Sequence, residues 1–257
     1  MIDWDDAFDN SSYVPGSAAL PARWADEAAA FRARRGEIDI AYGDGPRNRM
    51  DIFRPLGACA GLVVFVHGGY WHKLDKSYWS HLAHGALSRG WAMAIPSYTL
   101  APEARLTAIA QELTAAVNVA AGRVAGPVRL IGHSAGGHLV SRLACADSMV
   151  TARLERVLSV SGIHDLRPLL HTRMNDVLGL DAAEAEAESP ALLHPPKGVQ
   201  ARFWVGALER PELVRQTRLI AENWQAPNVF EQGQDHFSVI EGLRRPNAPL
   251  LQALLDG

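Results

Sequence analysis

The chain has 257 residues, 48% of them hydrophobic, which is enough for one substantial core and predicts a single domain across residues 1–257. A formal net charge of −3 predicts no basic surface for nucleic acid or anionic lipid. No apolar run is long enough to span a membrane, and the acidic N-terminus lacks the apolar core of a signal peptide. With only two cysteines, we expect a cytoplasmic protein whose partner is a small molecule, rather than nucleic acid or membrane, and homo-oligomer formation stays open.

Strand and helix patterns alternate along the chain. Apolar and β-branched runs predict strands at residues 37–42, 49–54, 61–66, 91–96, 127–131, 154–161, 201–205 and 228–231, the first two as an antiparallel pair. Helical patterns lie at residues 78–88, 102–124, 135–146 and 211–224, with a short C-terminal helix after them. This alternation predicts an α/β fold with a mostly parallel sheet and helices on both faces.

A Gly-His-Ser-Ala-Gly pentapeptide at residues 132–136 joins a predicted strand to a predicted helix. In this setting the pattern resembles the nucleophile elbow of α/β-hydrolases, a strained turn that presents a serine oxygen to a cleft. The flanking glycines permit the turn because they have no Cβ to strike neighbouring elements. We therefore predict that Ser134 is a nucleophile.

A second motif, His-Gly-Gly-Tyr-Trp at residues 67–71, follows the apolar strand at residues 61–66. In α/β-hydrolases the loop at this place supplies one backbone N–H to an oxyanion hole, and the residue after the nucleophile supplies the other. The alternative is that these glycines merely form turns between elements. Two motifs in the right order and setting favour the catalytic interpretation.

A serine nucleophile needs a base, which is itself oriented by an acid, and this fold places them in the order serine, acid, histidine. The histidines after the elbow are His138, His164, His171, His194 and His236. His236 alone follows the last predicted strand, so we predict it as the base. For the acid, Glu209 after the strand at residues 201–205 is preferred over Asp165, which follows the preceding strand.

Four segments together resemble kynurenine formamidase-type α/β-hydrolases, which are related to the hormone-sensitive-lipase-like esterases. They are residues 67–71, 132–139, 205–212 and 235–237. The resemblance implies Ser134, His236 and Glu209 as the catalytic triad and Gly68, Gly69 and Ala135 as the oxyanion hole. Glu209 stands where several members have aspartate, and members include broad acyl esterases. The resemblance thus predicts the reaction more firmly than the substrate.

The expected function is hydrolysis of a small acyl ester or an aryl formamide through an acyl-enzyme, without cofactor or metal. A short-chain carboxylesterase or thioesterase is the alternative enzyme, and a non-catalytic binding protein on the same fold is the alternative of another class. No HExxH or CxxC spacing supports a metal hydrolase. Tyr70 and Trp71 are candidate substrate-pocket residues, with core packing as the alternative for each.

Two segments lie outside the alternation of strands and helices. Residues 1–36 carry the aromatic side chains Trp4, Phe8, Tyr13 and Trp24 ahead of the sheet, and residues 163–200 contain prolines and an acidic stretch. Insertions at such places commonly cover the cleft of this fold, so both segments are candidates for a small lid. The alternative for the acidic stretch is a solvated helix face.

Overall fold

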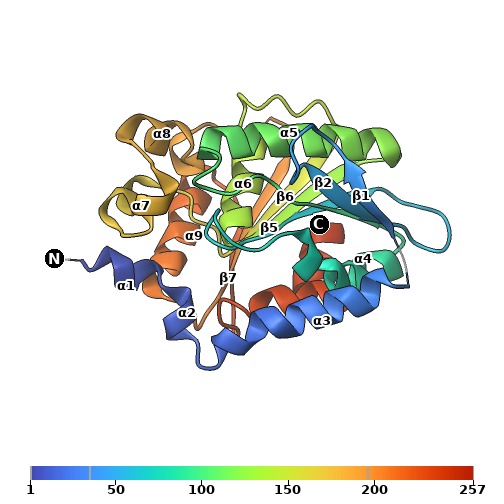
Figure 1. Cartoon of the computed structure of the whole chain (residues 1–257), viewed down its shortest axis with the longest axis horizontal. Helices are drawn as coiled ribbons and strands as arrows, with labels where there is room; N and C mark the ends of the chain where they lie inside the picture. Colours follow the sequence, from blue (N-terminus) through green and yellow to red (C-terminus); the bar gives the residue numbers. More distant parts are fainter. Residues whose placement is uncertain (1, 35, 196, 257) are drawn as a thin grey trace.

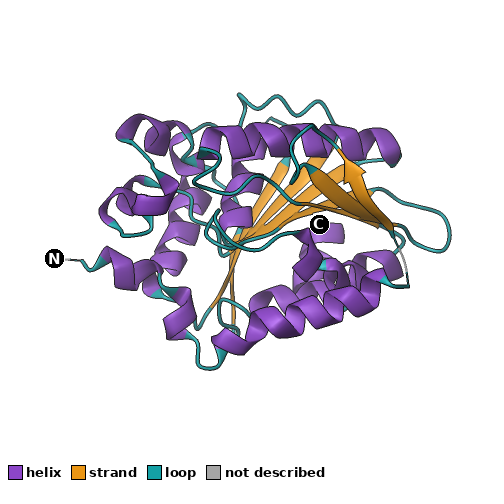
Figure 2. Ribbon diagram, in the orientation of Figure 1, coloured by secondary structure: helices purple, strands orange, loops and turns teal. Residues whose placement is uncertain are grey.

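The computed structural model describes residues 2–34, 36–195 and 197–256. Its strands form one eight-stranded sheet in the order β1-β2-β4-β3-β5-β6-β7-β8 (Figures 1 and 2). The pairings of β1 with β2 and of β2 with β4 are antiparallel, and the remaining pairings are parallel. The strands are β1 (Glu37–Ala41), β2 (Arg49–Phe53), β3 (Leu62–Val66), β4 (Ala92–Pro96), β5 (Val128–His133), β6 (Leu154–Val160), β7 (Gln200–Gly206) and β8 (Asn228–Glu231).

Helices cover both faces of the sheet. The α-helices are α1 (Trp4–Phe8), α2 (Asn10–Tyr13), α3 (Leu20–Arg32), α4 (Ala83–Ser88), α5 (Leu106–Arg123), α6 (Ala135–Ala144), α7 (Asn175–Leu178), α8 (Ala182–Ala187), α9 (Pro211–Asn223) and α10 (Pro249–Leu255). Buried side chains of α5, α6 and α9 form the core on one face, and those of α3, α4 and α10 form the core on the other (Figure 1). Within the described ranges, no helix is long and apolar enough to cross a membrane.

Strand β3 shows why the central strands are apolar throughout. All five of its residues are buried. Val64 and Val66 contribute to the core beneath α5 and α6, whereas Val63 and Phe65 contribute to the core on the opposite face. Because side chains alternate between the faces of a sheet, a strand covered by helices on both sides has no polar face.

The predicted fold class is confirmed, and each predicted strand is present with its ends shifted by at most two residues. Two helix predictions were wrong in part. The segment predicted as a helix at residues 78–88 consists of 3-10 turns up to Leu82, and α-helix follows from Ala83. The long helix begins at Leu106 rather than Pro102 because Arg105 has an extended backbone, with ψ 158°, and forms the N-cap.

The N-terminal segment (residues 2–34), in which no strand or helix was predicted, folds into α1, α2 and α3. Each of the first two helices begins at an aspartate whose side chain accepts a hydrogen bond from a backbone N–H in the first turn, an arrangement that stabilises helix starts. Helix α3 packs against the 3-10 turns after β3. Helices α1 and α2 lie beside the carboxyl end of the sheet, next to the site described below, whereas α3 runs along one face (Figure 1).

Candidate active site

Ser134 stands at a sharp turn between β5 and α6. Its backbone has φ 56° and ψ −121°, a conformation that is strained for a residue with a side chain and that often marks functional sites. Glycines on both sides allow the turn. A Cβ on Gly136 would lie 2.0 Å from the carbonyl oxygen of Val66, and one on Gly132 would lie 2.0 Å from that of Gly136. The start of α6 is therefore pressed against the end of β3, and Ser134 lines a cavity there.

His236 is held by Glu209 from a neighbouring loop. Nδ1 of His236 donates to Oε2 of Glu209 at 2.7 Å, and both side chains are buried. Oε1 of Glu209 accepts from the hydroxyl of Ser161 at 2.5 Å and from the backbone N–H of Gly206 at 2.9 Å. The carboxylate is thus fixed from three sides. In a ring that carries one proton, this contact places the proton on Nδ1 and makes Nε2 the acceptor.

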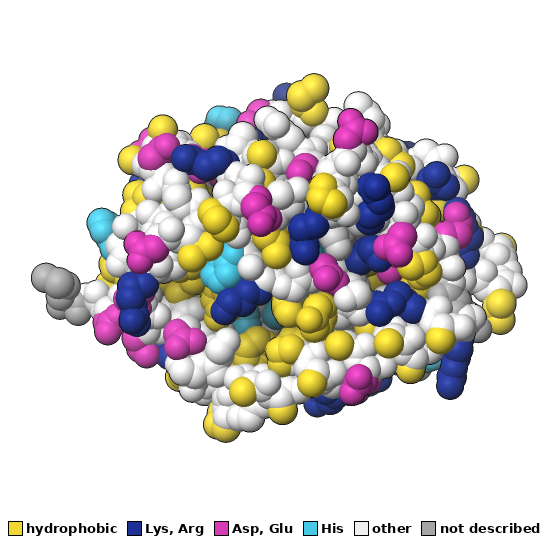
Figure 3. Space-filling view, in the orientation of Figure 1, with side chains coloured by type: hydrophobic (Ala, Val, Ile, Leu, Met, Phe, Trp, Pro, Cys, Tyr) yellow, Lys and Arg dark blue, Asp and Glu magenta, His cyan; other side chains and the backbone are white. Residues whose placement is uncertain are grey.

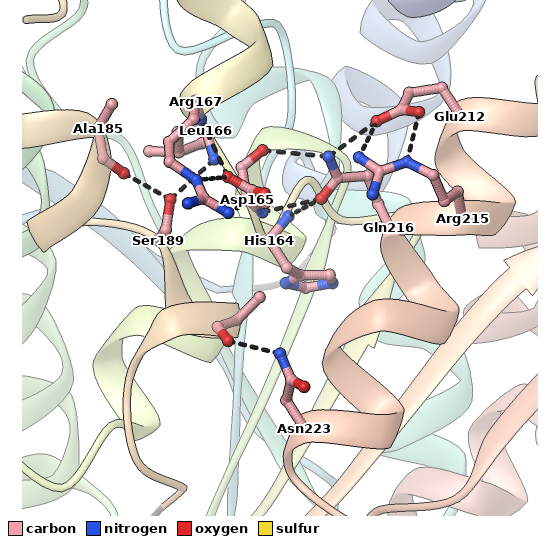
Figure 4. Close-up of polar contacts among 11 residues, drawn as sticks. His164, Asp165, Leu166, Arg167, Ala185, Ser189, Glu212, Arg215, Gln216 and Asn223 are labelled. Carbon is pink, nitrogen blue, oxygen red and sulfur yellow. Dashed lines mark hydrogen bonds and ion pairs between the residues drawn. The ribbon is translucent and has the colours of Figure 1, made fainter. Parts of the chain in front are cut away.

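Asp165, the alternative acid, is directed elsewhere (Figure 4). Its two oxygens accept from Nε and from a terminal nitrogen of Arg167, each at 2.9 Å. Its backbone N–H donates to Gln216 on α9. Burial opposes ionisation of Asp165, but the hydrogen bonds from Arg167 outweigh it and hold the pKa of the carboxyl below its usual range. The geometry therefore favours Glu209, rather than Asp165, as the residue that orients the base.

The predicted oxyanion residues surround Ser134. A Cβ on Gly68 would lie 3.0 Å from Cβ of Ser134, so this loop touches the elbow. Gly69 has φ 111°, and its carbonyl accepts from the N–H groups of two residues further along the loop. Ala135 is the first residue of α6, where backbone N–H groups have no partner within the helix. The structure thus brings Gly68, Gly69 and Ala135 to the place that the resemblance implied, although their role as donors stays a prediction.

Ser134 and His236 line one cavity of about 490 Å³, a volume typical of small-molecule sites. Trp24, Trp79 and Leu74 contribute apolar surface to its wall, and Asp9 and Lys73 contribute charge. Figure 3 shows a hollow in the surface of the molecule that contains histidine side chains and is bordered by hydrophobic side chains. The cavity therefore suits a small molecule with an apolar body.

The candidate pocket residues differ in position. Tyr70 lines the cavity, but the assignment of Trp71 to the pocket was wrong. Trp71 is fully buried, and its Nε1 donates to Nδ1 of His138 at 3.1 Å. Both residues have positive φ, 54° and 60°, which changes the side-chain directions expected from an ordinary loop. Trp71 therefore belongs to the core rather than to the substrate site.

The two candidate lid segments also differ. The N-terminal segment supplies residues from Asp9 to Trp24 to the cavity wall. None of the described residues in 163–200 lines the cavity. The acidic helix α8 of that range instead pairs with α5, where Glu184 accepts from Nε of Arg105 at 2.7 Å. The expectation of a lid from residues 163–200 is therefore corrected, whereas the N-terminal segment contributes to the wall of the cavity.

His133, next to the nucleophile, has a structural task. Its Nε2 donates to the backbone carbonyl of His236 at 2.7 Å, and the two rings lie 4.7 Å apart. Burial, together with the neighbouring imidazole of His236, lowers the pKa of His133 to about 3. His133 therefore stays neutral near pH 7 and secures the loop that carries the base.

Sequence reasoning missed Asn10. This buried residue of α2 donates from Nδ2 to Nε2 of His236 at 3.3 Å. The contact joins positions 226 residues apart, and nothing in the sequence pattern around Asn10 signals it.

Among the residues that the structure describes, no group of three or more His, Cys, Asp or Glu side chains is arranged to hold a metal ion.

The elbow, the buried His–Glu pair and the parallel sheet together define an α/β-hydrolase. The chain belongs to the alpha/beta hydrolase family, whose model matches residues 63–254. It is 28% identical over 237 residues to the kynurenine formamidase of Salmo salar, and the aligned residues cover 85% of this chain and 80% of the relative. The family match and the similarity to these relatives identify the chain as a hydrolytic enzyme of this family.

Solved structures agree with this assignment. A candidate thioesterase from Silicibacter sp. TM1040 is 44% identical to this chain, with a TM-score of 0.95 and full coverage of both chains. Esterase B from Lactobacillus rhamnosis shares the fold with a TM-score of 0.70 at 19% identity, over 92% of this chain and 91% of that one.

Proposed function

We propose that this enzyme is a serine hydrolase that cleaves small acyl esters and aryl formamides. The observation that carries the proposal is the buried contact between His236 and Glu209, together with the cavity that both His236 and Ser134 line. With its proton held at Nδ1, the imidazole presents the lone pair of Nε2 as a general base.

The reaction follows from these groups. Ser134 attacks the acyl carbon as His236 takes its proton, and the developing oxyanion accepts backbone hydrogen bonds from the Gly69 loop and Ala135. His236 then gives the proton to the leaving alcohol or amine, and the acyl group remains on Ser134 as an ester. A water molecule, deprotonated by His236, releases the acid and restores the serine.

The cavity supports a small acyl group and a flat leaving group. The ring centroids of Trp24 and Trp79 lie 4.7 Å apart, with the ring planes tilted by 37°. Both residues line the wall, so aromatic surface is available to an aryl group. An aryl amine leaves more readily than an alkyl amine, which makes a formyl anilide accessible to an esterase-like site. The kynurenine formamidase relatives favour the formamide.

The second candidate is a short-chain thioesterase or carboxylesterase. It is favoured by the 44% identity to the candidate thioesterase of Silicibacter. The site chemistry is the same, because the mechanism above requires only a carbonyl and a leaving group.

A substrate panel separates the two functions. The purified enzyme is assayed with N-formylkynurenine, N-formylaniline, p-nitrophenyl acetate, p-nitrophenyl octanoate and S-phenyl thioacetate, each with the Ser134→Ala variant as the blank. The formamidase proposal predicts that kcat/KM for N-formylkynurenine exceeds that for the octanoate ester by at least about tenfold. If the enzyme turned over the thioester but neither formamide, the formamidase proposal would be wrong and the thioesterase function would take its place.

A further inference from the structure

Asn10 reaches the one atom of the base that must change protonation during the reaction. Its Nδ2 lies 3.3 Å from Nε2 of His236, and its side chain is 1% exposed. Since Nδ1 of the ring donates to Glu209, Nε2 is an acceptor and Asn10 is the donor. The imidazole is therefore hydrogen-bonded at both nitrogens, to the acid on one side and to the N-terminal segment on the other.

Two of the residues that fasten the N-terminal segment, Arg210 and Tyr70, belong to the two catalytic loops. Arg210 directly follows Glu209, and its Nε donates to the backbone carbonyl of Asp9 at 2.7 Å while a terminal nitrogen pairs with Asp6 at 2.9 Å. Tyr70 directly follows Gly69, and its hydroxyl accepts from the backbone N–H of Asn10 at 3.2 Å. The acid loop and the oxyanion loop thus fix α2 between them.

The contacts of Asn10 are not those of a residue that serves stability alone. Among the described residues, its Oδ1 is buried without a hydrogen-bond partner. An unsatisfied buried amide oxygen is unfavourable, and such groups in native proteins call for an explanation. In the orientation that the structure shows, the amide presents Nδ2 to Nε2 of His236, so the contact favours the ring form in which Nε2 carries no proton.

We propose that Asn10 is a positioning residue for His236, whose amide N–H keeps the imidazole neutral, with its single proton on Nδ1, in the resting enzyme. This inference rests on the proposed role of His236 as the base. The N-terminal segment is then part of the catalytic apparatus as well as a wall of the cavity.

The groups around His236 make a pH profile interpretable. Glu209 faces Nδ1, His133 packs against the ring at 4.7 Å, and Asp9 and Lys73 line the same cavity. The pKa of His133 is lowered to about 3 by burial and by the neighbouring imidazole, and hydrogen bonds from Ser12 lower the pKa of Asp9. Neither of these two groups changes charge between pH 5 and 9, so neither produces a step in that range.

Loss of the Asn10 donor destabilises the neutral ring relative to the protonated one. Asn10→Ala is therefore expected to move the midpoint of the acid limb to higher pH by roughly half to one unit, the equivalent of one hydrogen bond. Asn10→Asp keeps the shape but adds a charge that favours the imidazolium, so its midpoint moves further. Asn223→Ala, at the exposed end of α9 (Figure 4), is the matched control and leaves the midpoint unchanged.

Arg210 tests the same contact from a distance. Arg210→Met releases the segment and is expected to raise the midpoint in the same direction as Asn10→Ala. The double variant Asn10→Ala/Arg210→Met then shows little more shift than the larger of the two single shifts, because both remove one interaction. Arg218→Met is its matched control, because Arg218 lies on α9, the helix that Arg210 precedes, and packs over the ring of Phe230.

The experiment measures the rate of inactivation by paraoxon from pH 5 to 9, with the label located by mass spectrometry, so that no natural substrate is needed. The proposal expects the ordered midpoints wild type, Asn10→Ala and Asn10→Asp. A wild-type midpoint in both Asn10 variants would overturn it, as would an Asp variant that shifts no further than Ala. Absence of label on Ser134 in the wild type would instead refute the proposed function.

Discussion

Replacing Glu209 by glutamine changes one atom of the side chain and reverses what that atom offers to His236. Oε1 of the carboxylate accepts from Ser161 and Gly206, so in glutamine the oxygen is best placed at that position. The NH₂ group then faces Nδ1 at a spacing of about 2.7 Å. Two donors cannot share that contact, so the ring proton moves to Nε2, the atom that must accept the proton of Ser134.

The expected loss in kcat is on the order of 10⁴-fold, which corresponds to about 5.5 kcal/mol of transition-state stabilisation and matches an aspartate-to-asparagine change in a serine protease triad. Asp165→Asn removes only the contacts with Arg167, and we expect less than a threefold effect. Both variants are compared with p-nitrophenyl acetate, after urea unfolding confirms that each is folded. If Asp165→Asn were the crippling change, the assignment of the acid would be wrong.

Three further predictions concern stability and metals. Gly136→Ala places a Cβ 2.0 Å from the carbonyl oxygen of Val66 and should lower the unfolding free energy by about 3 kcal/mol or more. Gly122→Ala on α5, where the added Cβ meets open space, should be neutral or stabilising. Equal effects of the two variants would contradict the close packing at the elbow. Burial lowers the pKa of several histidines to about 3 or 4, namely His67, His81, His133 and His138. Below about pH 6.5 the imidazoles of these histidines become protonated in the unfolded chain but not in the folded one. The unfolding free energy, measured in urea, should therefore fall from pH 7 to pH 5 by up to about 2 kcal/mol per histidine. A protein that is more stable at pH 5 would contradict those pKa shifts. Activity should persist in EDTA, and recovery of a lost activity by zinc would point to another class of hydrolase.

The sequence was sufficient for the sheet and the elbow because both depend on local patterns. A strand covered on both faces is apolar throughout, as β3 is, and the turn at Ser134 needs glycines at fixed spacing. The order of residues along the chain also pointed to His236. It allowed two acids, and the choice between Glu209 and Asp165 needed the contacts of each side chain.

The remaining features depend on contacts between distant parts of the chain. Asn10 meets His236 across 226 residues, and such a contact leaves no mark in hydrophobic periodicity. The direction of Trp71 depends on a backbone with φ 60°, which spacing does not reveal. Residues 163–200 read as an insertion over the cleft, but the carboxylate of Glu184 binds Arg105 and Thr107 beside α5 instead.

The most direct test of the account is the position of the covalent adduct. The enzyme is treated with paraoxon at pH 8 and digested, and the modified peptide is sequenced by mass spectrometry. We predict one diethylphosphoryl group, on Ser134, and a Ser134→Ala variant that remains folded, takes up no label and has lost at least about 10⁴-fold in kcat. Label on any other residue, or an alanine variant that keeps most of its activity, would contradict the assignment of Ser134 as the nucleophile.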